Sequence, residues 1–230
     1  MSNPRLDLSA IEASLRAVQR GFDRINATLE TPRDPFREEI LLALLEGYRF
    51  LDQLQEGDID LFAPGNSRRL LQLNCLVICE DPDPDLKQCA PHFRETERRF
   101  YDDRSLGGVR ALMNYLADHR HPTPWRRAAG VYTQILSEPQ LFFEGNHRTG
   151  VLLMSHILLR AGLPPCVLSA QNIKTCFDLS SRIKDLSKRR LRSKFALLDL
   201  SRRLAERLEA NADARYLLDW SAPALARRAE

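Results

Sequence analysis

Long apolar runs are absent from this sequence: no stretch of about 18 consecutive apolar residues occurs, so no membrane span and no membrane partner are expected. Residues 1–7 also lack the basic block followed by an apolar block that marks a signal peptide. Without such a signal, the five cysteines are expected to be reduced thiols. These absences predict a cytoplasmic protein. An effector exported without an N-terminal apolar signal would have the same features.

Charge of one sign is also scarce. The net charge is +3, which by itself neither favours nor excludes nucleic acid. One basic cluster occurs late in the chain, but only Phe195 is near it, whereas a surface that binds nucleic acid interleaves aromatic side chains with basic ones. We therefore interpret the cluster as a solvated face or as a contact for an acidic partner, and we do not expect nucleic acid to bind. The cluster consists of Lys184, Lys188, Arg189, Arg190, Arg192 and Lys194.

Strand-like alternation of apolar and polar residues is rare, and no internal repeat, low-complexity tract or sharp linker is present. Apolar residues recur instead at steps of three and four, the spacing of amphipathic helices. A hydrophobic content of 43% is enough for a core. The sequence therefore predicts an all-α fold. Helices are expected over residues 7–31, 35–56, 68–79, 110–119, 124–137, 147–161, 170–188 and 189–210.

The segment 140–150 lies between two of these expected helices and carries the most chemistry. Its Glu-Gly-Asn sequence is typical of a turn, so the chain is expected to break and to begin a new helix near His147. A helix start leaves backbone N–H groups unpaired and carries a partial positive charge, which favours a bound anion. The segment reads Gln140, Leu141, Phe142, Phe143, Glu144, Gly145, Asn146, His147, Arg148, Thr149 and Gly150.

Each polar residue of this segment has an expected role in binding a phosphate. Arg148 can make a two-pronged contact with phosphate oxygens. Glu144 can hold a magnesium ion whose other ligands are phosphates and water. Asn146 is expected to hold the turn by side-chain hydrogen bonds, and Phe142 to anchor it on the core. The interpretation is a nucleotide-phosphate cradle formed by residues 145–148, with Glu144 as the metal ligand.

These residues resemble the signature of the Fic/Doc (Fido) family, His-x-Phe-x-(Asp/Glu)-(Gly/Ala)-Asn-(Gly/Lys)-Arg. Gln140 stands where the family has its histidine, and His147 stands where it has glycine or lysine. The resemblance extends over roughly residues 110–165. The residues that match in register are Phe142, Glu144, Gly145, Asn146 and Arg148.

The resemblance implies a function and a domain arrangement. Fic proteins transfer a nucleotide monophosphate, usually AMP from ATP, to a hydroxyl of a target protein, and Doc-type members phosphorylate instead. The expected arrangement has three parts: an N-terminal helix in 1–34 packed on the core, a Fido-type helical domain over 35–210 with its centre at 110–165, and a C-terminal tail at 211–230 that is expected to fray from residue 222.

A hairpin called the flap lies upstream of the signature in Fic proteins and aligns the target protein. Here the segment 98–110 is at the corresponding place. Arg98 to Tyr101 and Gly107 to Val109 can form a short β-hairpin, or the segment can be helix with a glycine break. The hairpin would give the target protein a surface to bind.

Because Gln140 stands in place of the histidine, catalysis is expected to be weakened or altered. The family's histidine acts as the general base, and an amide cannot replace it because glutamine does not titrate in the usable range. Loss of a general base typically lowers the rate by about 10²–10⁴. Three interpretations follow: a slow or inactive relative that binds nucleotide, a protein that uses another base, with His147 the nearest candidate, or a variant chemistry such as Doc-like phosphotransfer. A protein of another class, a catalytically silent interaction module with the same fold, is the alternative.

Overall fold

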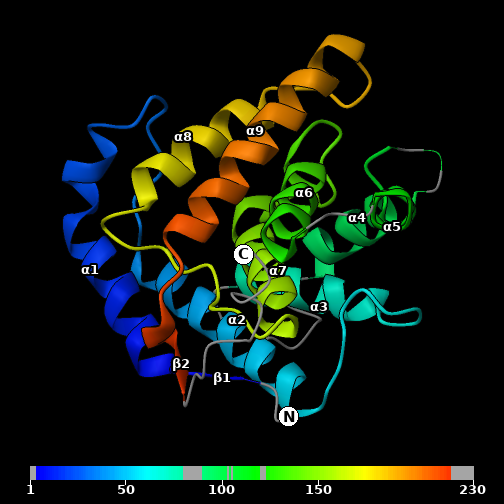
Figure 1. The fold of residues 1–230 in the computed structure, drawn as a ribbon. Helices are drawn as coiled ribbons and strands as arrows, with labels where there is room; N and C mark the ends of the chain where they lie inside the picture. Colours follow the sequence, from blue (N-terminus) through cyan, green and yellow to red (C-terminus); the bar gives the residue numbers. More distant parts are fainter. Residues whose placement is uncertain (1–3, 80–89, 103, 105, 120–122, 219–230) are drawn as a thin grey trace, which may run out of the picture.

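The structure is a computed structural model that describes residues 4–79, 90–102, 104, 106–119 and 123–218. Helices dominate these residues, so the predicted all-α class is confirmed (Figure 1). No helix in the described part combines the length and the apolarity needed to cross a membrane. The fraying expected from residue 222 lies outside the described residues. The helices are α1 (Leu8–Asn26), α2 (Glu38–Glu56), α3 (Ser67–Ile78), α4 (Ala90–Phe100), α5 (Val109–Asp118), α6 (Pro124–Leu136), α7 (Asn146–Arg160), α8 (Ile173–Lys184) and α9 (Leu191–Ala210), with a 3-10 turn η1 (Ala214–Tyr216) and two strands, β1 (Arg5–Leu6) and β2 (Leu217–Leu218).

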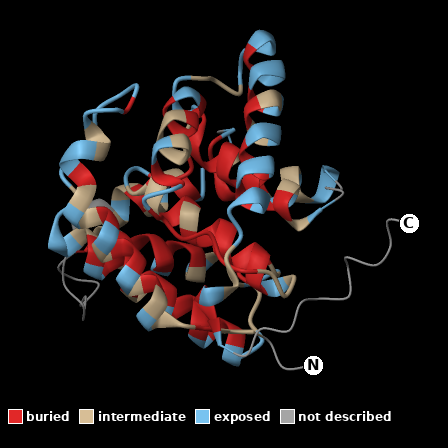
Figure 2. Ribbon diagram, turned by 60° about the vertical axis from the view of Figure 1, so that its left-hand side comes forward, coloured by how far each residue is buried: buried red, intermediate tan, exposed pale blue. Residues whose placement is uncertain are grey.

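Helix α7 runs through the middle of the molecule and packs against α6, α2 and α3. Nearly all of its residues after the first turn are buried. Buried residues, red in Figure 2, fill the interior of the molecule. Two glycines allow its neighbours to approach closely. A Cβ atom on Gly47 of α2 would collide with the side chain of Leu152, and one on Gly150 would lie 2.7 Å from the ring of Tyr132 on α6. The start of α7 is therefore held between two helices.

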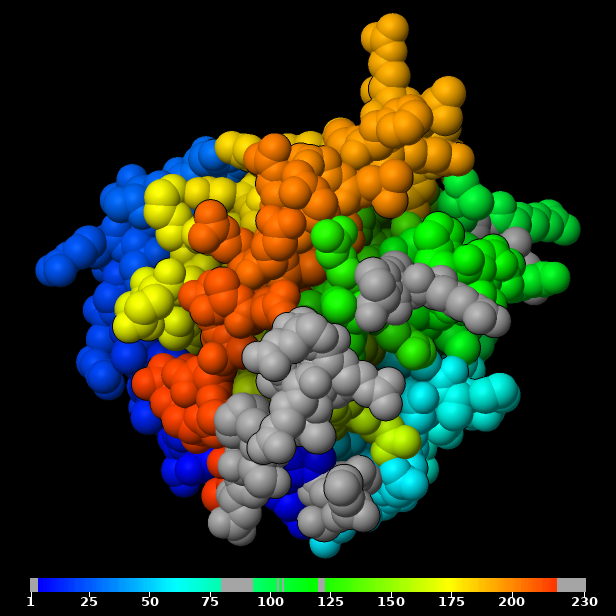
Figure 3. Space-filling model, in the orientation of Figure 1, coloured from blue at the N-terminus to red at the C-terminus, as the bar shows by residue number. Residues whose placement is uncertain are grey.

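The two ends of the described chain pack together. Strands β1 and β2 pair antiparallel, with Leu6 opposite Leu217. The Tyr216 hydroxyl donates to the Ser14 hydroxyl of α1 at 3.0 Å. Figure 3 shows the orange-red segment of residues 210–218 against the blue N-terminal residues. Residues 214–218 are thus part of the packed fold.

The segment 98–110 contains no strand among its described residues, so of the two alternatives the hairpin is not formed there. Helix α4 continues to Phe100, turns follow, and α5 begins at Val109, which matches the alternative of a helix with a glycine break. The physical reason is packing. The Phe100 ring is fully buried and stacks on Phe142, with centroids 5.6 Å apart. Gly107 lies so close to the loop that an added Cβ would be 2.7 Å from the Pro139 carbonyl oxygen.

The cysteines differ in part from expectation. Cys79, which follows α3, is disulfide-bonded, so the expectation that all five cysteines are free thiols is wrong for this residue. Cys75, Cys166 and Cys176 are free. Burial raises the pKa of the Cys75 thiol to about 11, which leaves it protonated and unreactive near neutral pH.

Candidate functional site: the loop that opens helix α7

The side chain of Asn146 closes the loop between α6 and α7. Its Oδ1 accepts from the Phe142 N–H at 2.9 Å, and its Nδ2 donates to the Phe142 carbonyl at 2.9 Å and to Gln140 Oε1 at 3.2 Å. The residue is buried, so this amide is used inside the loop. Of the donors of Asn146, only the backbone N–H is therefore left to bind a phosphate. The side chain of Asn146 acts by fixing the turn.

Two phenylalanines follow one another in the loop and point in different directions. Phe142 is fully buried against Phe100, whereas Phe143 is 48% exposed. The loop backbone is also held from outside, because the Arg99 Nε donates to the Gln140 carbonyl at 3.1 Å. Phe142 is thus the side chain that anchors the loop on the core.

Gly145 ends the loop in a left-handed conformation, with φ of 76°, immediately before the first residue of α7. An added Cβ would lie 2.9 Å from Asn74 Nδ2 and 2.9 Å from Ile78, so both the backbone conformation and the space require glycine. The Asn74 amide donates to the Glu144 carbonyl at 3.0 Å and to the Thr149 hydroxyl at 2.9 Å. It therefore joins the end of the loop to the first turn of α7.

Asn74 was not predicted from the sequence as part of the site. The available signal is a single amide within the apolar run of α3, between Leu73 and Cys75. A buried amide on such a face needs hydrogen-bond partners, and the loop supplies them. The sequence marks Asn74 as an unusual residue on this face but does not indicate which segment it contacts.

The start of α7 has the features of an anion site. Within the described part of the chain, no backbone acceptor pairs with the N–H groups of Asn146 and His147, and the first intrahelical bond runs from Thr149 to Gly145. Arg148 is partly buried in this turn, and Glu144 is exposed just before it. The described residues contain no group of three or more His, Cys, Asp and Glu side chains placed to hold a metal. A Mg²⁺ ion shared with phosphates and water needs only one or two carboxylates, and Glu144 can supply one.

Gln140 has a structural role in the loop. Its Nε2 donates to the Leu136 carbonyl at 3.1 Å, and its Oε1 accepts from the amide of Asn146. Both ends of the side chain are therefore engaged. With no titratable group, the residue holds the loop but cannot take a proton from a hydroxyl.

His147 faces inward, between α6 and the segment that precedes α2. Its Nε2 is 3.3 Å from the Arg33 guanidinium, and its Nδ1 is 3.3 Å from the Tyr132 hydroxyl. Since arginine can only donate, Nε2 accepts and Nδ1 carries the proton of a neutral imidazole. Burial, helped by Arg33 and Lys184, lowers the pKa of His147 to about 3. A ring whose lone pair is occupied and whose pKa is this low is a poor substitute base.

The pH dependence of stability tests this state of His147. Because its folded pKa of about 3 lies below the unfolded value of 6.5, the unfolded chain binds a proton that the folded protein excludes, and stability falls as the pH falls below 6.5. We expect His147 to contribute a loss of about 2 kcal/mol between pH 7 and pH 5. Burial also lowers the pKa of His156, which adds to the loss with the same sign.

Urea unfolding of the wild type and of His147→Gln at pH 7, 6 and 5 would separate the two contributions. The variant should lose the part of the pH dependence that belongs to His147 and keep the part of His156. Identical slopes in both proteins would show that His147 titrates normally in the folded state.

Lys188 departs from the interpretation of the 184–194 cluster as a solvated face. Its ammonium donates to the Gln134 carbonyl at 2.7 Å, and its backbone N–H donates to the Glu138 carbonyl at 2.8 Å. Burial lowers the pKa of Lys188 to about 7. Lys188 therefore braces the chain where α6 ends and the loop begins, while Lys184, Arg189 and Arg190 are exposed.

No protein-family model matches this sequence, and no curated protein and no solved structure matches it either.

Proposed function

We propose that the 140–150 loop binds the phosphates of a nucleotide, ATP or another, together with Mg²⁺. The observation that carries the proposal is the way α7 begins. The left-handed Gly145 leads directly into the N–H groups of Asn146 and His147, which meet no backbone acceptor among the residues that the structure describes. Arg148 lies in the same turn and Glu144 just before it. This combination of donors, a cation and a carboxylate suits a phosphate with its metal ion.

Each residue of the loop has a separate role in this proposal. The N–H groups of residues 145–147 contact phosphate oxygens, Arg148 contacts the terminal phosphates, and Glu144 holds Mg²⁺. Asn146 and Phe142 fix the turn. The resemblance of these residues to the Fic/Doc signature supports a nucleotide as the phosphate donor.

The proposed reaction is the transfer of AMP, or of phosphate in the Doc manner, to a hydroxyl of a target protein. We propose that it is slow. Gln140 cannot act as a base, and the lone pair of His147 is occupied by Arg33. Binding is therefore the main activity of the loop, and transfer proceeds without the contribution of about 10²–10⁴ that a general base typically supplies.

Thermal unfolding with nucleotides tests the binding. ATP, GTP, UTP or CTP with Mg²⁺ should raise the unfolding midpoint, because a ligand that binds only the folded state stabilises it. Arg148→Ala should reduce the affinity at least tenfold and leave the fold intact. Arg203→Ala, which removes an exposed arginine that pairs with Asp199 on α9, is the matched control and should bind as the wild type does.

An unchanged midpoint with all four nucleotides would contradict the proposal. The Fido-like loop would then belong to a catalytically silent module that binds a protein partner. Equal affinity in Arg148→Ala and wild type would mean that the phosphates bind elsewhere.

A further inference from the structure

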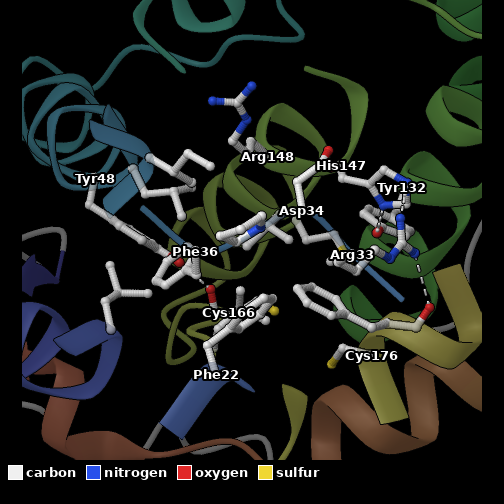
Figure 4. A pocket seen from close by; sticks show the side chains of 18 of the residues that line it. Phe22, Arg33, Asp34, Phe36, Tyr48, Tyr132, His147, Arg148, Cys166 and Cys176 are labelled. Carbon is white, nitrogen blue, oxygen red and sulfur yellow. Dashed lines mark hydrogen bonds between the residues drawn. The ribbon is translucent and has the colours of Figure 1, made fainter. Parts of the chain in front are cut away.

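A pocket of about 230 Å³ lies behind the start of α7, between α1, α2, α7 and α8 and the segment that joins α1 to α2. Figure 4 shows its interior, with Phe22, Phe36 and Tyr48 among the side chains that line it. Most of the lining is aromatic or aliphatic, and the Tyr48 hydroxyl is already bonded to the Cys166 carbonyl. The walls therefore favour an apolar ligand.

Three charged side chains also line the pocket, those of Asp34, Arg148 and Arg33. Arg33 lies at one end of it. One of its terminal nitrogens donates to the Ser181 hydroxyl at 2.7 Å, the Ser180 hydroxyl at 3.1 Å and the Phe177 carbonyl at 3.3 Å. The other terminal nitrogen faces the neutral ring of His147 at 3.3 Å. The guanidinium also lies over the Phe177 ring, 5.3 Å from its centroid. These contacts fix the group at one end of the pocket.

All of these partners are neutral. Among the described residues no carboxylate forms an ion pair with Arg33, and its Nε–H is enclosed without an acceptor. Asp34 also lines the pocket, but it is exposed and is not paired with Arg33. A charge held among apolar walls without a counter-charge is unfavourable, so an anion in the pocket would be stabilised.

We propose that this pocket binds a small monocarboxylic acid, with the carboxylate at Arg33 and an apolar chain among the aromatic walls. His147 is neutral, so the charged residues that line the pocket are Arg33, Arg148 and Asp34. Together they carry one net positive charge, which a single carboxylate balances. A phosphate would bring up to two charges and leave one uncompensated in an apolar site. This ligand is distinct from the nucleotide proposed at the loop, although Arg148 borders both sites.

The volume limits the length of the chain. A liquid water molecule occupies about 30 Å³, so a pocket of about 230 Å³ holds roughly eight water-sized groups. Hexanoate and octanoate span this size. Acetate has the same head group but fills only a small part of the pocket, and it should bind far more weakly because it buries little apolar surface.

A methionine of the wild-type protein can report this binding. Met154 lines the pocket, whereas Met113 lies on α5 and does not. With methionine methyl groups labelled with ¹³C, titration with octanoate should shift the Met154 signal to saturation, with a dissociation constant in roughly the millimolar range or tighter, and leave Met113 unmoved. Octylamine, with the same chain and a positive head, should bind at least tenfold more weakly.

Arg33→Gln tests the role of the guanidinium and should lower octanoate affinity at least tenfold, since charge-assisted hydrogen bonds are the stronger ones. Arg203→Gln on α9 should bind as the wild type does. The circular-dichroism spectrum of Arg33→Gln should match that of the wild type. If the variant fails to fold, the comparison of octanoate with octylamine in the wild type decides the matter alone.

Three results would overturn the proposal. The first is a Met154 signal that stays unmoved by saturating octanoate. The second is equal binding of octylamine and octanoate, which would show an apolar pocket without anion selectivity. The third is a folded Arg33→Gln variant with wild-type affinity for octanoate.

Discussion

Gln140→His should increase the transfer of AMP from ATP to protein by about 10²–10⁴-fold, the usual contribution of a general base. The wild-type loop holds Gly145, Arg148 and Glu144 in place but has no residue that can take the proton of an attacking hydroxyl. Histidine at position 140 introduces an imidazole on the same backbone. Its backbone carbonyl is anchored by Arg99, so the position itself is well fixed. The gain is measured as the intact-mass increase of the protein and of lysate proteins after incubation with ATP and Mg²⁺.

Two further variants test the cause of this increase in transfer rate. Gln140→Asn keeps a side-chain amide and adds no base, so its transfer rate should stay at the wild-type level. Adding Arg148→Ala to Gln140→His should return the rate to background, because the donor phosphates are no longer held. If Gln140→His stays inactive while nucleotides still stabilise it, the hydroxyl of the target is not presented at position 140.

Phe142→Ala should lower the free energy of unfolding by about 3–5 kcal/mol, the usual loss when a buried phenylalanine is truncated. The Phe142 ring is fully buried and stacks on the Phe100 ring, with an interplanar angle of 12°. Its removal leaves a cavity between α4 and the loop. Urea unfolding at pH 7 measures the difference.

Phe143→Ala is the matched control, because it removes the same side chain from the next position of the same loop. Phe143 is 48% exposed, so we expect a change within about 0.5 kcal/mol. Similar losses in both variants would mean that Phe142 does not anchor the loop. Nucleotide binding should be weaker in Phe142→Ala as well, since the turn that presents Gly145 depends on this ring.

The protonation state and the contacts of His147 could not be inferred from its place in the sequence. In sequence it is the histidine nearest to the missing base. In the folded chain it is held between Arg33 and Tyr132, which belong to segments far away in sequence. Its low pKa follows from that enclosure, and no local pattern around residue 147 predicts it.

Local chemistry determined much of the fold and the place of the site. Steps of three and four between apolar residues predicted the helices, because one side of each helix must be buried. The Glu-Gly-Asn turn predicted the start of α7 near residue 147, because glycine accepts the left-handed conformation that ends the loop. The all-α class and the candidate phosphate loop were therefore available from the sequence.

Contacts between distant segments decided the rest. The alternatives for residues 98–110, hairpin or helix with a glycine break, have similar local preferences, and the stacking of Phe100 on Phe142 goes with the helix. The support of the loop by Asn74 and the pairing of the chain ends also join residues far apart in sequence. The position of Arg33 at the end of an apolar pocket likewise depends on contacts between segments far apart in sequence. Such contacts depend on how the helices pack, and a one-dimensional pattern does not contain that information.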